Sequence, residues 1–146
     1  MNNIDFTTTI TVDQTPMEVF DAINQVSSWW QGQIEGSSNE TGNEFTYRMK
    51  DIHYSKQKVL ERVPAQKIVW LVIDSQLNFV TEKSEWTGTK IIFEISESNN
   101  QTLLHFTHQG LVPEFACYEG CSRGWNALIK QSLYNLITEG KGKDVF

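Results

Sequence analysis

Two hydrophobic periodicities, one following the other along the chain, constrain the fold more than any other feature of the sequence. Up to about Gly110, most segments alternate apolar and polar side chains, as half-buried β-strands do. Apolar residues then recur at helical spacing from about Glu114 to Glu139, centred on Trp125, and Gly140 ends the pattern. A sheet followed by one helix long enough to lie across it predicts a fold with a cavity between the two.

The alternating segments predict about six strands, of which one is central. Ile68, Trp70 and Val72 on one face of a segment are matched by apolar residues on its other face, as in a strand covered on both sides. The last two strands are expected to form a hairpin across residues 97–101. Residues 76–87 show no clear pattern. The predicted strands cover residues 4–12, 44–50, 53–63, 67–75, 88–97 and 102–109.

Two short helices are predicted directly after the first strand. Thr15, Pro16 and Glu18 have the spacing of a capping box with proline at the first helical position. A second helical turn is predicted around residues 26–30, ending at Gly32, and residues 36–42 are polar and glycine-bearing, which predicts a loop.

Composition narrows the classes of function. The chain of 146 residues fits a single domain, residues 1–146. Its 12 Lys and Arg against 18 Asp and Glu give a formal charge of -6, which argues against binding to nucleic acid or to an anionic membrane. No stretch approaches the roughly 18 apolar residues of a membrane span, and the N-terminus does not have the pattern of a signal peptide. We therefore expect a cytoplasmic protein with reduced cysteines.

Four short motifs accompany this order of elements: Ser28-Trp29-Trp30, Glu85-Trp86-Thr87-Gly88-Thr89, Thr102-Leu103-Leu104-His105-Phe106 and Gly124-Trp125. With them the chain resembles the START-like (SRPBCC) helix-grip superfamily, and within it domains related to the activator of the heat-shock protein 90 ATPase. The resemblance implies an α+β fold in which a curved antiparallel sheet wraps around a long C-terminal helix. It also implies a cavity between sheet and helix, which relatives such as lipid-transfer domains and polyketide cyclases share.

Large apolar side chains near the proposed interface of helix and sheet are the candidate ligand contacts. His108 and Tyr47 stand out because each adds a polar tip that could orient a ligand. Each candidate also has a plainer interpretation, as ordinary core or, for His108, as a buried histidine with satisfied hydrogen bonds. The candidates are Trp29, Trp30, Phe45, Tyr47, Trp70, Phe93, Phe106, His108, Trp125 and Ile129.

The two cysteines allow three interpretations. Cys117 and Cys121 are four residues apart where the final helix is expected to begin, so in a regular helix they share a face. They could be buried small hydrophobic residues, a redox or disulfide pair, or half of a metal site, and the first is favoured because free cysteine is often buried.

Catalytic and metal-binding patterns are weak, and we expect no catalytic residue, metal or cofactor. His105 and His108 are three apart in a predicted strand, which turns them to opposite faces. No Ser, His and acid grouping and no phosphate-binding glycine loop has the expected spacing. The carboxylates that could serve a cyclase are better explained by a solvated face: Asp21, Glu35, Glu61 and Glu94.

The sequence therefore favours a non-catalytic module, monomeric or homodimeric, that binds a small apolar or aromatic molecule such as a lipid, a phenolic or a polyketide-like compound. The resemblance implies an alternative, a co-chaperone or protein-interaction domain. A cyclase- or hydrolase-like enzyme is the third hypothesis.

Overall fold

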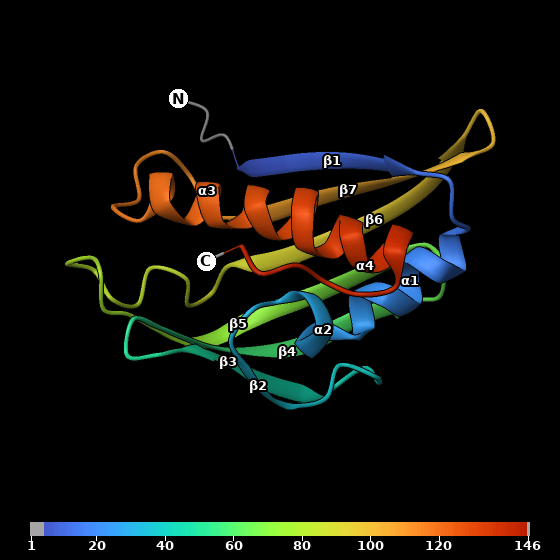
Figure 1. The fold of residues 1–146 in the computed structure, drawn as a ribbon. Coiled ribbons are helices and arrows are strands. Elements are labelled where there is room, and N and C mark those ends of the chain that lie inside the picture. Colours follow the sequence, from blue (N-terminus) through green and yellow to red (C-terminus); the bar gives the residue numbers. More distant parts are fainter. Residues whose placement is uncertain (1–4, 146) are drawn as a thin grey trace.

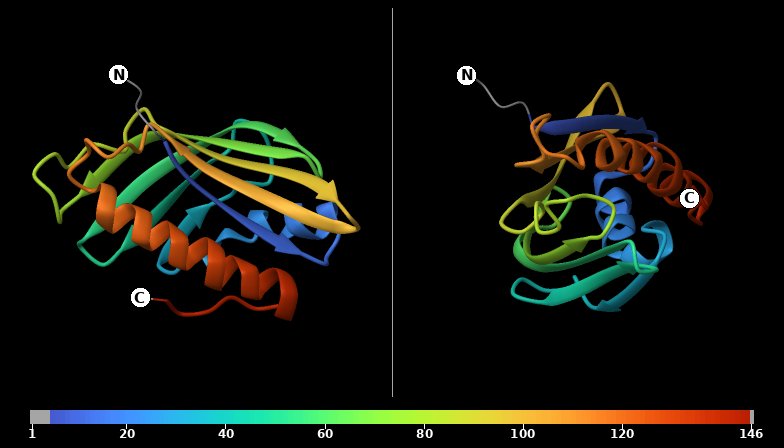
Figure 2. Two further views of the ribbon diagram at one scale, coloured as in Figure 1. Left: turned by 90° about the horizontal axis from the view of Figure 1, so that it is seen from above. Right: turned by 90° about the vertical axis from the view of Figure 1, so that its left-hand side faces the viewer.

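The computed structural model describes residues 5–145, which form a seven-stranded antiparallel sheet and a long C-terminal helix (Figure 1). Seen along two further directions, the sheet curves around that helix (Figure 2). The strands are β1 (Phe6–Val12), β2 (Gln33–Gly36), β3 (Glu44–Met49), β4 (His53–Val63), β5 (Lys67–Leu77), β6 (Lys90–Ser98) and β7 (Gln101–Gln109). The helices are α1 (Pro16–Asn24), α2 (Val26–Trp29), α3 (Tyr118–Ala127), the π-helical segment η1 (Leu128–Leu133) and α4 (Tyr134–Glu139).

The strand order is β1-β7-β6-β5-β4-β3-β2, so each strand from β3 to β7 lies beside its neighbour in sequence. The first strand instead pairs with the last, with Phe6 opposite His108. β1 alternates buried and exposed residues throughout its length, as its sequence predicts, whereas Ile4 lies outside the described residues. β6 and β7 form the predicted hairpin, and Asn99 and Asn100 at its tip both have positive φ, at 53° and 66°.

The central position predicted for β5 is confirmed, because β5 is the fourth of the seven strands. The expectation that both of its faces are covered is wrong for most of the outer face, on which only Val69 of the three predicted apolar residues is buried. Ile68, Trp70 and Val72 point inward and are fully buried, whereas Leu71 and Ile73 are half-buried. The helices cover only the inner face of the sheet (Figure 2).

The strand β2 is missing from the sequence prediction. It has only four residues and a single partner, β3, at one edge of the sheet. Ile34 is its one apolar side chain, so no alternation is visible.

The predicted start of α1 is confirmed in atomic detail. The Thr15 hydroxyl accepts from the backbone N–H of Glu18 at 3.2 Å, and the Glu18 carboxylate accepts from the backbone N–H of Thr15 at 3.0 Å. Pro16 occupies the first helical position.

The long helix begins at Tyr118, four residues later than predicted, and changes hydrogen-bond pattern in its middle. In η1 the wider π-helical turn buries four of six residues, Leu128, Ile129, Ser132 and Leu133. Gly140 ends the helix with φ 89° and an N–H bond to the carbonyl of Leu136, as a C-cap glycine does.

Beyond Gly140 the chain turns back along the helix (Figure 1). The Lys143 N–H donates to the Ser132 hydroxyl at 3.2 Å, and the Val145 N–H donates to the Gln31 side chain at 2.7 Å. Just before them, Gly142 lies so close to the Ser28 carbonyl that a Cβ would collide with it. This segment therefore needs a glycine to reach its place.

Candidate functional site

Stacked aromatic rings fill the deep part of the space between sheet and helix. The Trp30 ring lies parallel to Tyr47, with centroids 4.2 Å apart, and parallel to Trp70 at 6.4 Å. Trp70 meets Phe93 edge-on at 4.9 Å. These rings are at most 2% exposed, so this part of the interface is packed core.

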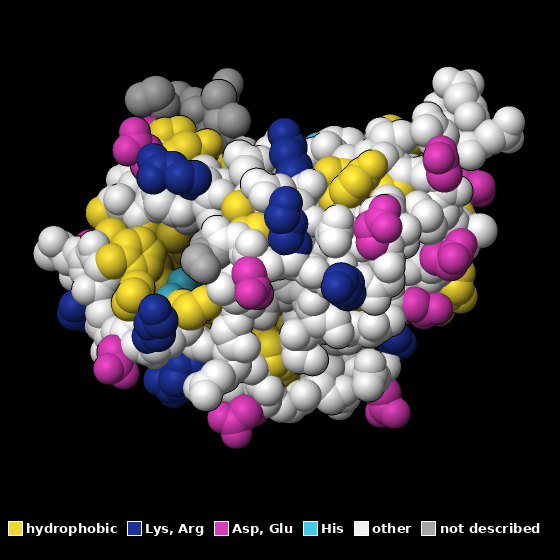
Figure 3. Space-filling view, in the orientation of Figure 1, with side chains coloured by type: hydrophobic (Ala, Val, Ile, Leu, Met, Phe, Trp, Pro, Cys, Tyr) yellow, Lys and Arg dark blue, Asp and Glu magenta, His cyan; other side chains and the backbone are white. Residues whose placement is uncertain are grey.

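Beside α3, the first part of the long helix, the interface between helix and sheet opens into a pocket of about 340 Å³. Figure 3 shows hydrophobic side chains gathered around a hollow on this side of the molecule, with a histidine side chain visible in it. Its walls come from the end of α2, strand β3, the β3–β4 turn with the start of β4, the loop after β5, helix α3 and the start of η1. The lining residues are Trp30, Tyr47, Met49, Lys50, Ile52, His53, Phe79, Trp86, Gly120, Cys121, Gly124, Trp125 and Leu128.

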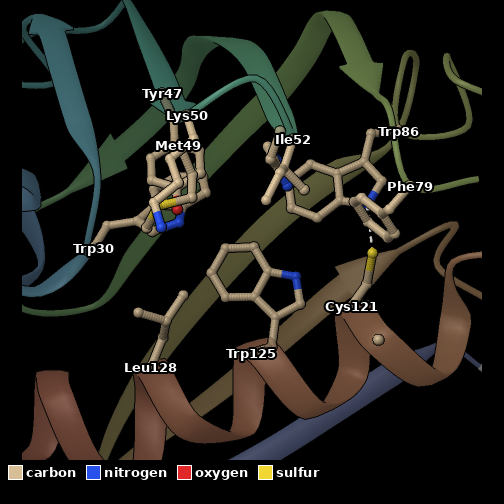
Figure 4. Close-up of a pocket in the computed structure, with 13 residues that line it drawn as sticks. Trp30, Tyr47, Met49, Lys50, Ile52, Phe79, Trp86, Cys121, Trp125 and Leu128 are labelled. Carbon is tan, nitrogen blue, oxygen red and sulfur yellow. Dashed lines mark hydrogen bonds between the residues drawn. The ribbon is translucent and has the colours of Figure 1, made fainter. Parts of the chain in front are cut away.

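The close-up shows how these walls face each other (Figure 4). Trp125 and Leu128 rise from the helix toward Tyr47 and Trp30 at one end of the pocket. Ile52, Phe79 and Trp86 lie at the other end, above Cys121. Gly120 and Gly124 add no side chain on the helix side, which leaves room between the helix and the loop.

Three of the predicted ligand contacts, Trp30, Tyr47 and Trp125, line this pocket. The others are buried core residues that do not line it: Trp29, Phe45, Trp70, Phe93, Phe106, His108 and Ile129. The predicted carboxylates Asp21, Glu35, Glu61 and Glu94 do not line it either.

Sequence analysis missed Trp86, the most enclosed residue of the loop between β5 and β6. It is 3% exposed and stacks on Trp125, with ring centroids 5.7 Å apart and planes 10° from parallel. Its motif was visible in the sequence, but the loop has no hydrophobic period that would assign a direction to its side chain. His53 was missed because it opens a strand of weak pattern.

His108 is a buried histidine whose hydrogen bonds are all satisfied within the fold. An indole N–H can only donate, so Nδ1 of His108 accepts from Trp125 at 2.9 Å. The Thr89 hydroxyl donates to the Trp86 carbonyl and therefore accepts from Nε2–H of His108, at 2.7 Å. Burial, with a smaller contribution from the nearby His53, lowers the pKa of His108 to about 3, so the ring is neutral. Its polar tip is used in the fold and does not face the pocket.

The Tyr47 hydroxyl is also engaged. It donates to the Gln31 carbonyl at 2.6 Å. Burial raises the pKa of Tyr47, opposed by a smaller effect of its hydrogen bond with Trp30. Tyr47 therefore contributes the face of its ring to the pocket, as a neutral phenol.

His53 is the polar side chain of the pocket that the fold leaves unpaired. It makes no hydrogen bond with any residue between 5 and 145, and its Nε2 is buried without a partner. The ring stands edge-on to Tyr47 and Trp86, with centroids 5.0 and 4.5 Å away. Burial lowers the pKa of His53 to about 4, so this imidazole is neutral at physiological pH.

Cys117 and Cys121 are both free thiols and both buried. The Trp86 indole N–H donates to Sγ of Cys121 at 3.3 Å. The pKa of Cys117 is raised, first by its hydrogen bond with Cys121 and then by burial, so Cys117 stays protonated. A protonated, buried thiol is a poor nucleophile, which fits the interpretation of the pair as small hydrophobic residues.

Glu85 links the loop between β5 and β6 to the residues just before α3 through two hydrogen bonds. Its two carboxylate oxygens accept from the backbone N–H groups of Ala116 and Cys117, at 2.9 and 3.1 Å. These donors precede the first turn of α3, where a negative charge is favourable. Trp86, the next residue, is thereby held over the pocket.

Within the described part of the chain, no three His, Cys, Asp or Glu side chains gather as metal ligands do. None of the described helices has both the length and the apolar character that a membrane crossing requires.

Several solved structures have a fold similar to that of this chain. The chain is similar to the Aha1 dimer from Colwellia psychrerythraea, with a TM-score of 0.77 and 22% identity over 95% of this chain and 99% of that one. Protein SSP2350 from Staphylococcus saprophyticus gives 0.72 and 17%, covering 98% of each chain. DynU16, from the dynemicin biosynthetic locus, gives 0.69 and 14% over 97% of this chain and 49% of that one. The curated proteins gave no match.

At these identities the solved structures show the fold alone, which is the START-like helix-grip fold that the sequence predicts. A family model adds the relationship: the one described as activator of Hsp90 ATPase homolog 1-like protein matches residues 13–138. The chain therefore belongs to the family of activator of Hsp90 ATPase homolog 1-like proteins.

Proposed function

We propose that this protein is a non-catalytic binding module that holds a small apolar or aromatic molecule, such as a lipid, a phenolic or a polyketide-like compound. The observation that carries the proposal is the pocket of about 340 Å³ between helix and sheet. Its volume lies within the roughly 300–1,000 Å³ of small-molecule sites, and aromatic and aliphatic side chains dominate its walls. Three indole rings, those of Trp30, Trp86 and Trp125, contribute apolar surface to these walls.

The chemistry of the lining favours binding over catalysis. None of the described carboxylates lines the pocket. His53 is neutral and has no acidic partner to orient it, and Cys121 accepts a hydrogen bond instead of facing a base. A nucleophile paired with a general base, which a hydrolase needs, is not among the lining residues. A cyclase-like or hydrolase-like enzyme thus remains the weaker hypothesis.

Native mass spectrometry of protein purified from cells, compared with the denatured mass, tests the proposal. We expect a small molecule to be retained with the folded chain. Titration with the fluorescent compound phenylnaphthylamine gives a second readout, since quenching of tryptophan emission reports on rings that touch the ligand.

A pair of variants locates the binding. Gly120→Met places a side chain where only the Phe79 ring, 3.8 Å from the new Cβ, is near, so it fills the pocket. Glu119→Met adds the same side chain at a neighbouring exposed position that does not line the pocket. Loss of binding in Gly120→Met alone is expected. No retained mass and no phenylnaphthylamine binding to the wild-type protein would overturn the proposal.

A protein-interaction role is the second candidate, favoured by the family and by two exposed apolar side chains at the mouth of the pocket. Ile52 is 47% exposed and Phe79 is 46% exposed. Heat-shock protein 90 is the partner to test first, by pull-down and by its ATPase rate. In the double variant Ile52→Ser, Phe79→Ser, unchanged capture would exclude this surface. The cytoplasmic location and a monomeric or homodimeric state remain predictions from the sequence.

A further inference from the structure

We propose that the ligand is an amphipathic anion, whose apolar body lies in the pocket and whose acidic group lies at the mouth beside Lys50. This inference rests on the proposed function and adds the charge and the orientation of the ligand. It follows from where the lining carries charge and where it carries none.

The interior of the pocket offers nothing that balances a charge. The imidazole of His53 is neutral, the Tyr47 hydroxyl is bonded to Gln31, and the thiol of Cys121 already accepts from an indole. An ionised group buried among these residues would lose its hydration and meet no opposite charge, since the unpaired Nε2 of the neutral His53 offers only a hydrogen bond, and this is costly. A charged ligand must therefore keep its charged end at the mouth.

At the mouth, Lys50 is the one residue with a formal charge at neutral pH among the described residues that line the pocket. It is exposed, and no ion pair within 4.0 Å engages it in the described range, residues 5–145, where the two ion pairs are Lys56 with Glu44 and Lys67 with Glu61. Its acidic neighbour Asp51 makes no ion pair either. The ammonium group is thus available to a ligand.

The turn that carries Lys50 is fastened at both sides. Lys50 has φ 50°, and the Ile52 N–H closes the turn by donating to the Met49 carbonyl at 3.1 Å. The Asn78 side chain donates to the Asp51 carbonyl at 2.6 Å, which ties the turn to the loop after β5. Lys50 is therefore held on the rim of the mouth, on the side of Tyr47 and Met49 and across from the exposed Ile52 and Phe79 (Figure 4).

The positive charge of Lys50 contrasts with the net negative charge of the whole chain. With a formal charge of -6, the surface as a whole repels anions. Salt screens such long-range repulsion over roughly 8 Å at physiological ionic strength, whereas a direct contact with Lys50 acts at shorter range. Any preference for an anion over its neutral analogue must then arise at this position.

Two fluorescent compounds with the same aromatic framework test the inference. Anilinonaphthalene sulfonate carries a sulfonate, and phenylnaphthylamine is its uncharged parent. Lys50→Met keeps the length and the apolar stem of the side chain and removes the charge. We expect it to weaken sulfonate binding by roughly three- to fivefold and to leave the uncharged compound unaffected. Lys130→Met, at an exposed position on η1 away from the pocket, is the matched control and should change neither.

The outcomes separate this inference from the proposed function. If phenylnaphthylamine binds and Lys50→Met changes both compounds equally, or neither, the anion inference is overturned and the binding pocket stands. Sulfonate binding that persists in Gly120→Met is surface binding and also overturns it. If neither compound binds the wild-type protein, the proposed function fails and the inference with it.

Discussion

The Nε1–H of Trp125 donates a hydrogen bond of 2.9 Å to Nδ1 of the buried His108, which joins the long helix to the strand β7 through two side chains. The same indole ring forms a wall of the pocket. A hydrogen bond therefore holds this wall of the pocket in place. It is shielded from water, because His108 is 0% exposed.

Replacing Trp125 by phenylalanine should destabilise the fold by about 1–3 kcal/mol, because a buried ring nitrogen of His108 loses its donor. Urea denaturation measures the loss. Trp70→Phe is the matched control: the Nε1 of Trp70 is buried without a partner, so its removal leaves no acceptor unpaired. A loss in Trp70→Phe as large as that in Trp125→Phe would contradict the role given to the hydrogen bond.

The free energy of unfolding should fall as the pH falls below about 6.5. Burial lowers the pKa of His53 from 6.5 to about 4 and that of His108 to about 3, whereas the unfolded chain keeps ordinary values. At pH values between the folded and the unfolded pKa of each histidine, the unfolded state binds more protons than the folded state, so acid favours unfolding. The free energy of unfolding then falls by up to about 1.4 kcal/mol per pH unit for each histidine.

Urea denaturation at several pH values between about 7 and 5 measures this slope. His53→Gln removes one titrating group from the pocket and should flatten the dependence. An unchanged slope in that variant would mean that His53 is hydrated enough to be protonated in the folded state.

Glu85→Ala should cost about 1 kcal/mol, because two backbone N–H groups before α3 lose their acceptor. Faster amide hydrogen exchange at Ala116 and Cys117 would locate the effect. Glu82→Ala is a control in the same loop, at an exposed position whose side chain makes no described hydrogen bond. Equal effects of the two changes would point to loop charge instead of this contact.

Both cysteines should react slowly with iodoacetamide in the folded protein and rapidly in denaturant. Cys117 is 1% exposed, Cys121 is 7% exposed, and the raised pKa of Cys117 keeps it out of the reactive thiolate form. Mass spectrometry of labelled peptides gives the rate for each residue. Fast labelling of Cys117 under native conditions would revive the redox interpretation of the pair.

Patterns with a local physical cause were predictable from the sequence. The cap at Thr15 and Glu18, the helix end at Gly140 and the central position of β5 were all confirmed, because each depends on nearby residues or on a clear period. The short edge strand β2 and the late start of α3 were not, since the former has one apolar residue and the latter depends on a distant carboxylate, that of Glu85.

The position of the pocket was harder to predict for a related reason. Sequence period shows that Phe93, Phe106 and His108 face inward, but not whether their neighbours fill the space above them. Trp30 and Trp70 do so by stacking, which closes the deep end of the interface. Trp86, by contrast, comes from a loop without a period, and only its tertiary contacts show that it covers the open end.

The pairing of β1 with β7 has a consequence for biosynthesis. Phe6 lies opposite His108, so β1 must wait for its partner until all the residues between the two strands have left the ribosome. Pairings between segments so far apart in sequence close large loops and slow folding. Until β7 arrives, the apolar face of β1 is open to nonspecific association, and the translation rate and chaperone access should therefore influence the yield of folded protein.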